Sequence, residues 1–318
     1  NKEFENLGTD KLFITPKSGF GTGLNAVNKL TKDELKLIKK ISGVENSAGT
    51  VLANSKVEFE DNVGFFLIHS FPDGEEKKLE EETHGLKIIE GRDLRDSDKF
   101  SALIGNTMIK KELLGKNLRL RDKIKINGYE FTVVGILDKT GDPVGDKTIY
   151  IPEDTLRKIF NEPEKLDTII VKVENIANIN IITERIKSEL RRVRELKRDE
   201  EDFDIQTPED ILGSFRLILN IVQSVLIGIA GISLLVGGVG IANTMYTAVI
   251  ERRKEIGIMK SLGATNTDIL AIFLFESGML GAIGGAIGAI LGFGLSKGIE
   301  FIAKNFLGTN LVSAYFSY

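Results

Sequence analysis

Hydrophobic and polar positions divide the chain into two regions. Residues 1 to about 212 mix apolar positions with frequent Lys, Glu and Asp, as expected of a domain in water. Residues 217–250 contain no charged side chain, and residues 269–296 contain one, Glu276. Each of these stretches exceeds the roughly 20 residues that an α-helix needs to cross a bilayer. The pattern predicts a membrane protein with a head domain at 1–212 and a membrane region at 213–318, whose spans lie at about 217–248 and 269–296.

Local patterns within the head domain predict two β-α-β units on either side of a β-rich segment. Thr31 and Glu34 have the spacing of a capping box, and apolar residues at 35, 38 and 41 follow at helical spacing. Asn127-Gly128 stands between two alternating runs, which is the pattern of a β-hairpin. The predicted strands are 12–15, 44–59, 63–71, 123–126, 129–137, 148–151, 168–173 and 203–206, and the predicted helices are 31–41, 104–114, 152–160 and 178–196.

A further helix is predicted to begin where the head domain ends. Thr207 stands in the N-cap position, Pro208 in the first turn, and Glu209 and Asp210 near the positive end of the helix dipole. Because apolar residues follow soon afterwards without a helix-breaking pattern, we expect this helix to run directly into the first span.

The connection between the two spans, residues 250–266, sets the predicted orientation. It holds Arg252, Arg253, Lys254 and Lys260 in a short segment. Short connections rich in Lys and Arg stay on the cytoplasmic side, whereas large domains cross the membrane regardless of their charge. We therefore expect a multi-pass protein of the cell membrane, with its head domain on the extracytoplasmic side.

That orientation also predicts membrane spans on both sides of the two visible ones. A head domain outside the cytoplasm requires a span that precedes Asn1. At the other end, the apolar residues 310–318 are typical of the approach to a further span. We expect the sequence to belong to a longer protein.

Glycines are spaced so that they form one face of the second span. Gly284, Gly288 and Gly292 fall four residues apart, as do Gly281 and Gly285. In lipid, small residues let helices approach closely. We expect this face to pack against neighbouring helices, within the subunit or across a dimer.

Glu276 is the charged residue inside the second span, where burial of a charge is costly. It lies about two helical turns from the cytoplasmic end of the span. We favour a structural role, in which Glu276 extends to the membrane surface or pairs with a neighbouring residue. A role in proton or substrate movement is the alternative.

Composition and motifs limit the chemistry of the chain. The net charge of −4 is too small to indicate a nucleic-acid partner, and the chain has no cysteine. It has no glycine-rich phosphate loop followed by Lys and Ser or Thr, so it does not bind ATP by that motif. His69 and His84 are the only histidines and lack the HExxH pattern, so each is expected to be a surface or strand residue. We predict no catalytic, cofactor-binding or metal-binding residue, and an enzymatic head domain is the least favoured alternative.

The connection and its flanks resemble a known family. Ala242-Asn243-Thr244-Met245 is followed by Glu251-Arg252-Arg253-Lys254-Glu255-Ile256-Gly257 and by Lys260-Ser261-Leu262-Gly263-Ala264. These residues resemble the signature ER-x-x-EIG-x-x-x-x-x-GA of the MacB/FtsX/LolCE group, which are the permeases of type VII ABC transporters. In the head domain, residues 7–12 resemble the family's segment just outside the first span. Residues 102–106 and 125–137 resemble the extracytoplasmic domain of the MacB-like branch.

The resemblance implies an α+β extracytoplasmic domain joined to transmembrane α-helices. The family's domain combines a porter-like subdomain of β-α-β units with an inserted β-rich subdomain, often called Sabre. On this chain the porter-like subdomain corresponds to residues 1–85 and 165–212, and the Sabre-like subdomain to residues 86–164. Family members have four spans, so the first and last are expected outside this sequence.

The resemblance further implies a homodimeric permease, without catalytic activity of its own, bound to two copies of a separate cytoplasmic ATPase that binds the ATP. The connection would couple ATP hydrolysis to motion of the head domain, which is called mechanotransmission. An amphipathic helix there offers Ile256, Met259 and Leu262 to a groove, and its basic residues meet acidic rims. The implied coupling residues are Glu251, Arg252, Arg253, Lys254, Glu255, Ile256, Gly257, Met259, Lys260, Leu262, Gly263 and Ala264.

Two other functions stay open at this point. A FtsX-like regulator would use the same spans to act on a cell-wall hydrolase, although the size and layout of the head domain favour an exporter. A membrane-anchored receptor or adhesion module would use the spans only as an anchor, and the ordered connection argues against it. The transported substrate is left open.

Overall fold

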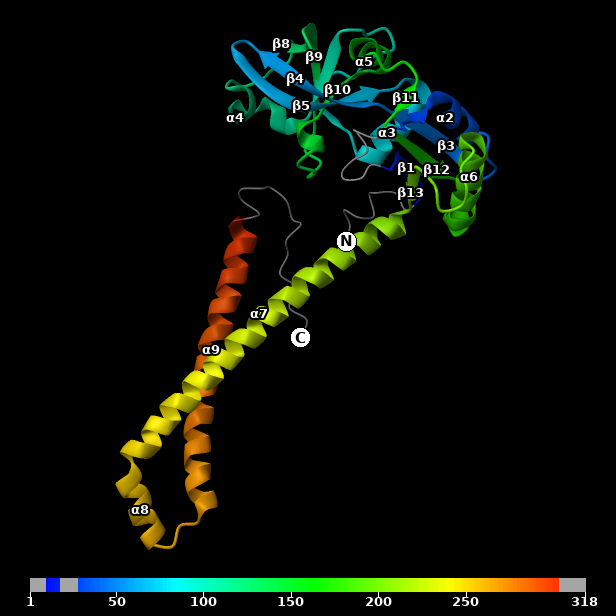
Figure 1. Ribbon diagram of the computed structural model, residues 1–318. Helices are drawn as coiled ribbons and strands as arrows, with labels where there is room; N and C mark the ends of the chain where they lie inside the picture. Colours follow the sequence, from blue (N-terminus) through cyan, green and yellow to red (C-terminus); the bar gives the residue numbers. More distant parts are fainter. Residues whose placement is uncertain (1–9, 18–27, 303–318) are drawn as a thin grey trace. The chain divides into compact units, whose positions relative to one another are not determined.

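The computed structural model describes residues 10–17 and 28–302 of the chain. The chain divides into two compact units, Asn1–Ser214 and Phe215–Tyr318, which we call the head domain and the membrane unit (Figure 1). The division falls close to the predicted limit at residue 212. The predictions about a span before Asn1, about residues 310–318 and about residues 7–9 lie outside the described residues.

Two interlocked β-α-β units form the first sheet of the head domain. Their elements are β1 Lys11–Pro16, α2 Lys32–Ile38, β3 Val44–Thr50, β12 Thr168–Val173, α6 Ile179–Arg194 and β13 Phe203–Gln206. The strand order is β13-β1-β12-β3, and all neighbours are antiparallel. Consequently β1 and β3 run parallel with β12 between them, and β12 and β13 run parallel with β1 between them. The two predicted β-α-β units are confirmed, in the interlocked arrangement known as split β-α-β.

Side-chain alternation along these strands decides which helices cover each face of the first sheet. The helix α2 begins with the predicted capping box, in which Thr31 and Glu34 each bond the other's backbone N–H. On the opposite face, Ala48 and Ile170 pack against Leu79 of α3, which spans Gly74–His84. The residues that join α2 and α6 to the sheet in the main core are Leu12, Ile14, Ile169 and Val171 on the strands, and Ile38, Ile182, Ile186 and Leu190 on the helices.

The second sheet closes on itself. Its elements are β4 Leu52–Phe59, β5 Asn62–Phe71, β6 Ile88–Gly91, β7 Ser101–Ile104, β8 Lys123–Ile126, β9 Tyr129–Leu137 and β10 Ile149–Pro152. The strand order is β6-β9-β7-β10-β5-β4-β8, and β8 also pairs with β9. The pairing of β8 with β9 therefore closes six of the seven strands into a ring, to which β6 is added at β9. Closure removes open strand edges, and Phe131 is fully buried in the core.

Most of the predicted elements of the head domain are present. The hairpin of β8 and β9 turns at Asn127 and Gly128, both with positive φ, as a two-residue turn requires. The predicted helix 152–160 is α5. The remaining short elements are β2 Leu30–Thr31, η1 Asn106–Ile109, α4 Lys111–Leu114, η2 Gly145–Lys147, α5 Glu153–Phe160, β11 Lys165–Leu166 and η3 Ile176–Asn178.

Two predicted elements are wrong in the same way. The predicted strand 44–59 is two strands, because the chain leaves the first sheet at Val51 and enters the second as β4. The predicted helix 104–114 begins inside β7, whose Ile104 is buried between β9 and β10, and only short helical turns follow. In both cases pairing with strands distant in sequence overrides the local apolar spacing.

The helix α3 has no counterpart among the predicted elements. Leu79 is the one apolar aliphatic residue in its sequence GEEKKLEEETH, so the helix lacks the apolar stripe on which the prediction of helices relied. Besides the contact of Leu79 with Ala48 and Ile170, ion pairs hold α3 to the first sheet. Glu82 approaches Lys11 of β1 at 3.2 Å and Lys172 of β12 at 3.5 Å.

The subdomain limits stay a prediction, with one difference in strand membership. The porter-like subdomain was predicted to include residues 52–71, but the structure pairs these as β4 and β5 with strands of the predicted Sabre-like subdomain. The physical reason is again that the chain crosses from the first sheet to the second sheet at Val51. Its N–H donates to Ser70 Oγ of β5 at 2.8 Å, so β4 starts alongside β5.

The membrane unit contains three helices within its described residues. They are α7 Pro208–Glu251, which begins in the head domain, α8 Arg253–Ser261 and α9 Asn266–Ile302 (Figure 1). Segments 208–251 and 266–299 are long and apolar enough to cross a membrane. The predicted N-cap is confirmed, because Thr207 Oγ1 accepts from the N–H of Asp210 and the Asp210 carboxylate accepts from the N–H of Thr207.

Candidate functional site

The structure brings the predicted coupling residues together in one short helix and its two ends. Glu251 ends α7, Arg252 is the N-cap residue of α8, and Leu262 is its C-cap residue. The other predicted coupling residues lie on α8 or in the turn that follows it. Their role in coupling stays a prediction.

An ion pair ties the start of α8 to the following span. Arg252 Nη1 lies 3.2 Å from Glu276 Oε2 of α9. The preferred interpretation of Glu276, that it pairs with a neighbouring residue, is therefore confirmed in geometry. Because the two residues are 24 positions apart, the pair closes the loop that contains α8.

Backbone geometry fixes the turn at the other end of α8. Gly263 has a φ of +99°, which glycine adopts at no steric cost. The N–H of Ala264 donates to Met259 O at 3.0 Å, and the N–H of Gly263 donates to Lys260 O at 3.1 Å, which is a Schellman motif. Thr265 then caps α9 through a reciprocal pair of bonds with Asp268. The helix stop and the next helix start are thus consecutive.

The apolar residues of α8 do not all face the same way. Ile258 is 61% exposed and Leu262 is 83% exposed, whereas Ile256 and Met259 are half-buried. Ile258 and Leu262 are four residues apart and share a helix face. Of the predicted docking residues Ile256, Met259 and Leu262, only Leu262 is largely exposed, and Ile258 was not among them. Their docking role stays a prediction. Four-residue spacing of Ile258 and Leu262 is the signal that identifies this face.

The glycine face of α9 meets no other segment of the described chain. A Cβ atom placed on any of these glycines would have no other heavy atom within 4 Å, apart from the surrounding helix backbone. Packing against another span stays a prediction. The residues are Gly281, Gly284, Gly285, Gly288 and Gly292.

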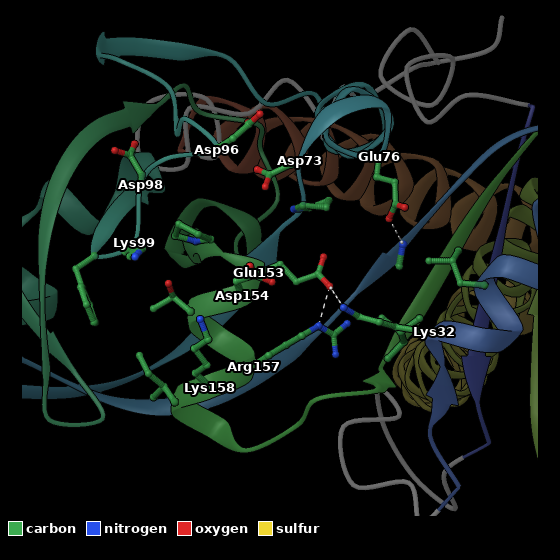
Figure 2. Close-up of a pocket in the computed structure, with 18 of the residues that line it drawn as sticks. Lys32, Asp73, Glu76, Asp96, Asp98, Lys99, Glu153, Asp154, Arg157 and Lys158 are labelled. Atoms are coloured by element: carbon green, nitrogen blue, oxygen red, sulfur yellow. Dashed lines mark hydrogen bonds and ion pairs between the residues drawn. The ribbon is translucent and has the colours of Figure 1, made fainter.

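A pocket of about 640 Å³ lies on the head domain (Figure 2). Six basic and six acidic residues are among those that line it. Several neutralise each other, since Glu153 approaches Lys32 at 3.2 Å and Arg157 at 2.7 Å. Burial, followed by the nearby charges of Asp96 and Asp154, raises the pKa of Asp73. The balanced charge gives this pocket no preference for a ligand of one sign.

The two histidine rings lie close together, with their centroids 5.5 Å apart. His69 lies on β5 and His84 ends α3, which agrees with a strand residue and a surface residue. However, Glu80 precedes His84 by four residues, and the three side chains converge in space. The HExxH pattern concerns residues of a single helix, whereas His69 comes from another element than Glu80 and His84. The expectation of no metal-binding residue stays untested.

One nucleophile-like pattern has no matching structure. Gly294-Leu295-Ser296-Lys297-Gly298 fits the form Gly-x-Ser-x-Gly. A nucleophile elbow requires a sharp turn between a strand and a helix. These residues lie within the continuous helix α9, so the pattern is a chance match.

Two family models match the chain and divide it as its architecture does. The MacB-like periplasmic core domain matches residues 1–189, and the FtsX-like permease C-terminal matches residues 227–318. The chain belongs to the MacB/FtsX type of ABC transporter permease. It is a membrane protein with an extracytoplasmic domain, as the sequence analysis predicted.

Relatives of this permease come from archaea and bacteria. An uncharacterized ABC transporter permease of Methanocaldococcus jannaschii is 36% identical over 321 residues, which cover 100% of this chain and 77% of the relative. The uncharacterized ABC transporter permease YknZ of Bacillus subtilis is 30% identical over 87% of this chain and 69% of its own length. The macrolide export ATP-binding/permease protein MacB of Campylobacter fetus is 30% identical over 96% of this chain but only 47% of its own length.

A solved structure supports the fold of the permease's head domain. The periplasmic region of MacB from Actinobacillus actinomycetemcomitans superposes with a TM-score of 0.54 at 17% identity. The match covers 68% of this chain and 98% of the solved one. At this identity the likeness concerns the fold alone.

Proposed function

We propose that this permease is the membrane subunit of an ATP-driven export complex and that α8 couples it to a separate cytoplasmic ATPase. In this proposal the connection 250–266 faces the cytoplasm, and the head domain lies outside. Two permease chains assemble with two ATPase copies, and the permease itself is not catalytic. The observation that carries the proposal is the exposed pair Ile258 and Leu262 on a helix held firmly at both ends.

The chemistry of α8 fits a protein partner. An apolar helix face binds in a hydrophobic groove through residues spaced by three or four positions, which Ile258 and Leu262 satisfy. Arg253, Lys254 and Lys260 are exposed around this face and would meet acidic side chains at the rim of such a groove. The partner is therefore expected to present an apolar groove with an acidic rim.

Transmission to the head domain would use α7. This helix continues from Pro208, directly after the last strand of the first sheet, to Glu251, next to α8. In this proposal α7, a helix of 44 residues, would carry a displacement of α8 toward the head domain. The relative named MacB is described as both ATP-binding and permease, and this chain matches 47% of its length.

The proposal is tested by reconstituting the full-length permease in lipid nanodiscs with the ABC ATPase encoded in the same genome. Wild-type permease is expected to bind the ATPase and to change its hydrolysis rate. Ile258→Glu and Leu262→Glu place a charge in the groove and are each expected to weaken binding at least tenfold, which corresponds to about 1.4 kcal/mol.

The matched control is Ile181→Glu, at an exposed isoleucine of α6 in the head domain. It is expected to bind and stimulate the ATPase as the wild type does. Full ATPase binding by Leu262→Glu and Ile258→Glu would contradict the coupling role of α8. The mass of the intact complex tests the stoichiometry of two permeases and two ATPases.

A further inference from the structure

Three side chains with metal-binding atoms converge in the head domain. His69 comes from β5, and Glu80 and His84 come from one face of α3. His84 Nε2 lies 3.2 Å from Glu80 Oε2, and His69 Nε2 lies 4.0 Å from the same oxygen. The ligand atoms of all three residues lie within 4.8 Å of one another. These are the only histidines in the chain.

Glu80 has one satisfied and one unsatisfied carboxylate oxygen. Its side chain is fully buried. Oε1 accepts a hydrogen bond from Thr50 Oγ1 of β3, whereas no donor among residues 10–17 and 28–302 is aligned on Oε2. A buried carboxylate oxygen without a hydrogen bond is costly, and here it points at the two imidazoles. The groups nearest to Oε2 are therefore His84 Nε2 at 3.2 Å and His69 Nε2 at 4.0 Å.

The other groups around the cluster orient the imidazole of His69. Its Nδ1 lies 2.8 Å from Ser70 O, so Nδ1 carries the proton and donates, which leaves the lone pair of Nε2 directed at the cluster. The ring of Tyr150 lies 4.9 Å from the His69 ring and shields it from water. Such a backbone contact and an apolar neighbour are typical of metal-binding histidines.

We propose that His69, Glu80 and His84 bind one divalent transition-metal ion, with Zn²⁺ as the occupant. Two histidines and one carboxylate are a ligand set that Zn²⁺ accepts, with bonds of about 2.0–2.2 Å. A tetrahedral ion then places its ligand atoms about 3.3–3.6 Å apart. The 3.2 Å distance from His84 Nε2 to Glu80 Oε2 is close to this range. The other distances between ligand atoms, of up to 4.8 Å, would have to shorten by about an ångström.

The fourth position is open to solvent on the side of His84. The side chain of His84 is 38% exposed, whereas Glu80 is fully buried and His69 nearly so. The ion therefore enters past His84, and a water molecule completes the tetrahedron. With no cysteine in the chain, the ligands are nitrogen and oxygen only, which favours Zn²⁺ over softer ions such as Cu⁺.

The ion would link the two sheets of the head domain. Glu80 and His84 belong to α3, which packs on the first sheet through Leu79. His69 belongs to β5 of the second sheet. In the absence of an ion, the Glu80–His84 ion pair stays within α3 and links nothing. Metal binding is thus expected to stiffen the junction of the two sheets, where no disulfide does so.

The test uses the full permease in nanodiscs, stripped of metal with a chelator. Zn²⁺ is added in competition with a chromophoric chelator, and Co²⁺ is used as a spectroscopic probe because four-coordinate Co²⁺ absorbs visible light. We expect one high-affinity Zn²⁺ per chain, a visible Co²⁺ spectrum that Zn²⁺ abolishes, and much weaker binding of Ca²⁺. At a hundredfold excess over its Kd, Zn²⁺ should raise the head domain's Tm by about 5–10 °C.

Single substitutions distinguish Zn²⁺ binding at this site from binding at carboxylates on the surface. His84→Ala removes a surface ligand, and Glu80→Gln keeps the carbonyl that accepts from Thr50; each is expected to lower Zn²⁺ affinity at least a hundredfold and to abolish the Tm rise. Glu75→Gln, at an exposed glutamate of α3, is the matched control and should bind as the wild type does. Absence of stoichiometric Zn²⁺ binding, or equal binding by His84→Ala and Glu80→Gln, would overturn the proposal.

Discussion

The head domain and the membrane unit use apolar residues in opposite ways. In the head domain, residues such as Ile14 and Phe131 are completely buried in the core. In the membrane unit, Leu234 of α7 is 78% exposed, and the most apolar windows of both long helices bury no residue within the described chain. The difference shows that periodic apolar positions select a protein core, whereas helices that are apolar on all sides require a surrounding of lipid or other spans.

The same comparison shows what the two regions share. Thr31 with Glu34, Thr207 with Asp210, and Thr265 with Asp268 form one type of reciprocal N-cap at three helix starts. These caps depend on residues three positions apart and not on the surroundings. Local rules of helix formation therefore apply equally to both regions, and only the long-range packing differs.

The largest expected effect tests whether the burial of apolar residues is confined to the head domain. Phe131→Ala removes a fully buried ring and is expected to lower the free energy of unfolding of the head domain by about 4 kcal/mol. Leu234→Ala, at an exposed position of α7, should leave that free energy unchanged. Pulse proteolysis of the full chain in urea measures both, and a loss of head stability in Leu234→Ala would refute the comparison.

The second-largest expected effect follows from removing a buried charge in the head domain. Arg194 of α6 bonds both oxygens of Glu34 and one oxygen of Asp202, with little exposure of any partner. Arg194→Met removes the cation that neutralises the carboxylates of Glu34 and Asp202 and is expected to cost about 3 kcal/mol. Arg192→Met, at an exposed ion pair two residues away, should cost less than about 0.5 kcal/mol. The same urea titration compares the free energies of unfolding of the two variants. Equal losses would contradict the interpretation that Arg194 stabilises the head domain through a buried ion pair.

Two glycines with nearly the same backbone angle provide a matched pair across the two regions. Gly43 in the head domain has a φ of +98°, and Gly263 after α8 has a φ of +99°. An added Cβ lies 2.8 Å from the side chain of Ile182 at Gly43, but meets nothing within 4 Å at Gly263. Gly43→Ala combines strain and overlap and should cost about 2 kcal/mol, whereas Gly263→Ala should cost about 1 kcal/mol through strain alone.

Hydrogen exchange of the full chain measures this pair at both positions. Amides near Gly263, at 259–266, should exchange about fivefold faster in Gly263→Ala, which corresponds to about 1 kcal/mol of local stability. Amides of α2 and α6 should exchange more than tenfold faster in Gly43→Ala. A larger increase in exchange rate for Gly263→Ala than for Gly43→Ala would contradict the matched pair. It would mean that the turn after α8 is packed against a component of the complex that this chain does not contain.

The smallest expected effect concerns a surface ion pair and its pH dependence. The hydrogen bond from Arg92, at 2.6 Å, lowers the pKa of Asp98. A lowered folded pKa stabilises the fold above the unfolded pKa, and this contribution is lost as the pH falls below about 4. Asp98→Asn should therefore cost about 0.5–1 kcal/mol at neutral pH and nothing at low pH. Asp96→Asn, at an exposed neighbouring residue, should have the same free energy of unfolding as the wild type at every pH. Urea titrations of both variants and the wild type at a series of pH values measure the difference.

Much of the fold was accessible from the sequence because its signals are local. The caps of α2 and α7, the turn at Asn127-Gly128 and the strand 168–173 depend on residues close together in the chain. The division at Val51 and the strand that contains Ile104 depend on partners more than ten residues away, so the local pattern was misleading. The helix α3 was missed because ion pairs and hydrogen bonds, which have no period, hold it in place.

The candidate site was predicted unevenly for the same reason. The connection 250–266 is a continuous segment, so its residues could be identified together. Its exposed face was not, because burial of Ile256 and exposure of Ile258 depend on the helices around α8. The cluster of His69, Glu80 and His84 joins two elements, and a search for spacing along the chain cannot detect such a site.

The passage of the chain at Val51 has a consequence for how this head domain can vary among homologues. The outgoing and returning strands meet there, because the N–H of Asp167 donates to Thr50 O and its carboxylate accepts from the N–H of Leu52, both at 2.8 Å. Segment 52–166 therefore leaves and rejoins the first sheet at one point. Insertions are tolerated where both ends lie close together. Evolution, or protein engineering, can thus exchange this segment as a cassette while the split β-α-β sheet keeps its register, provided that α3 keeps its contacts with β1, β3 and β12.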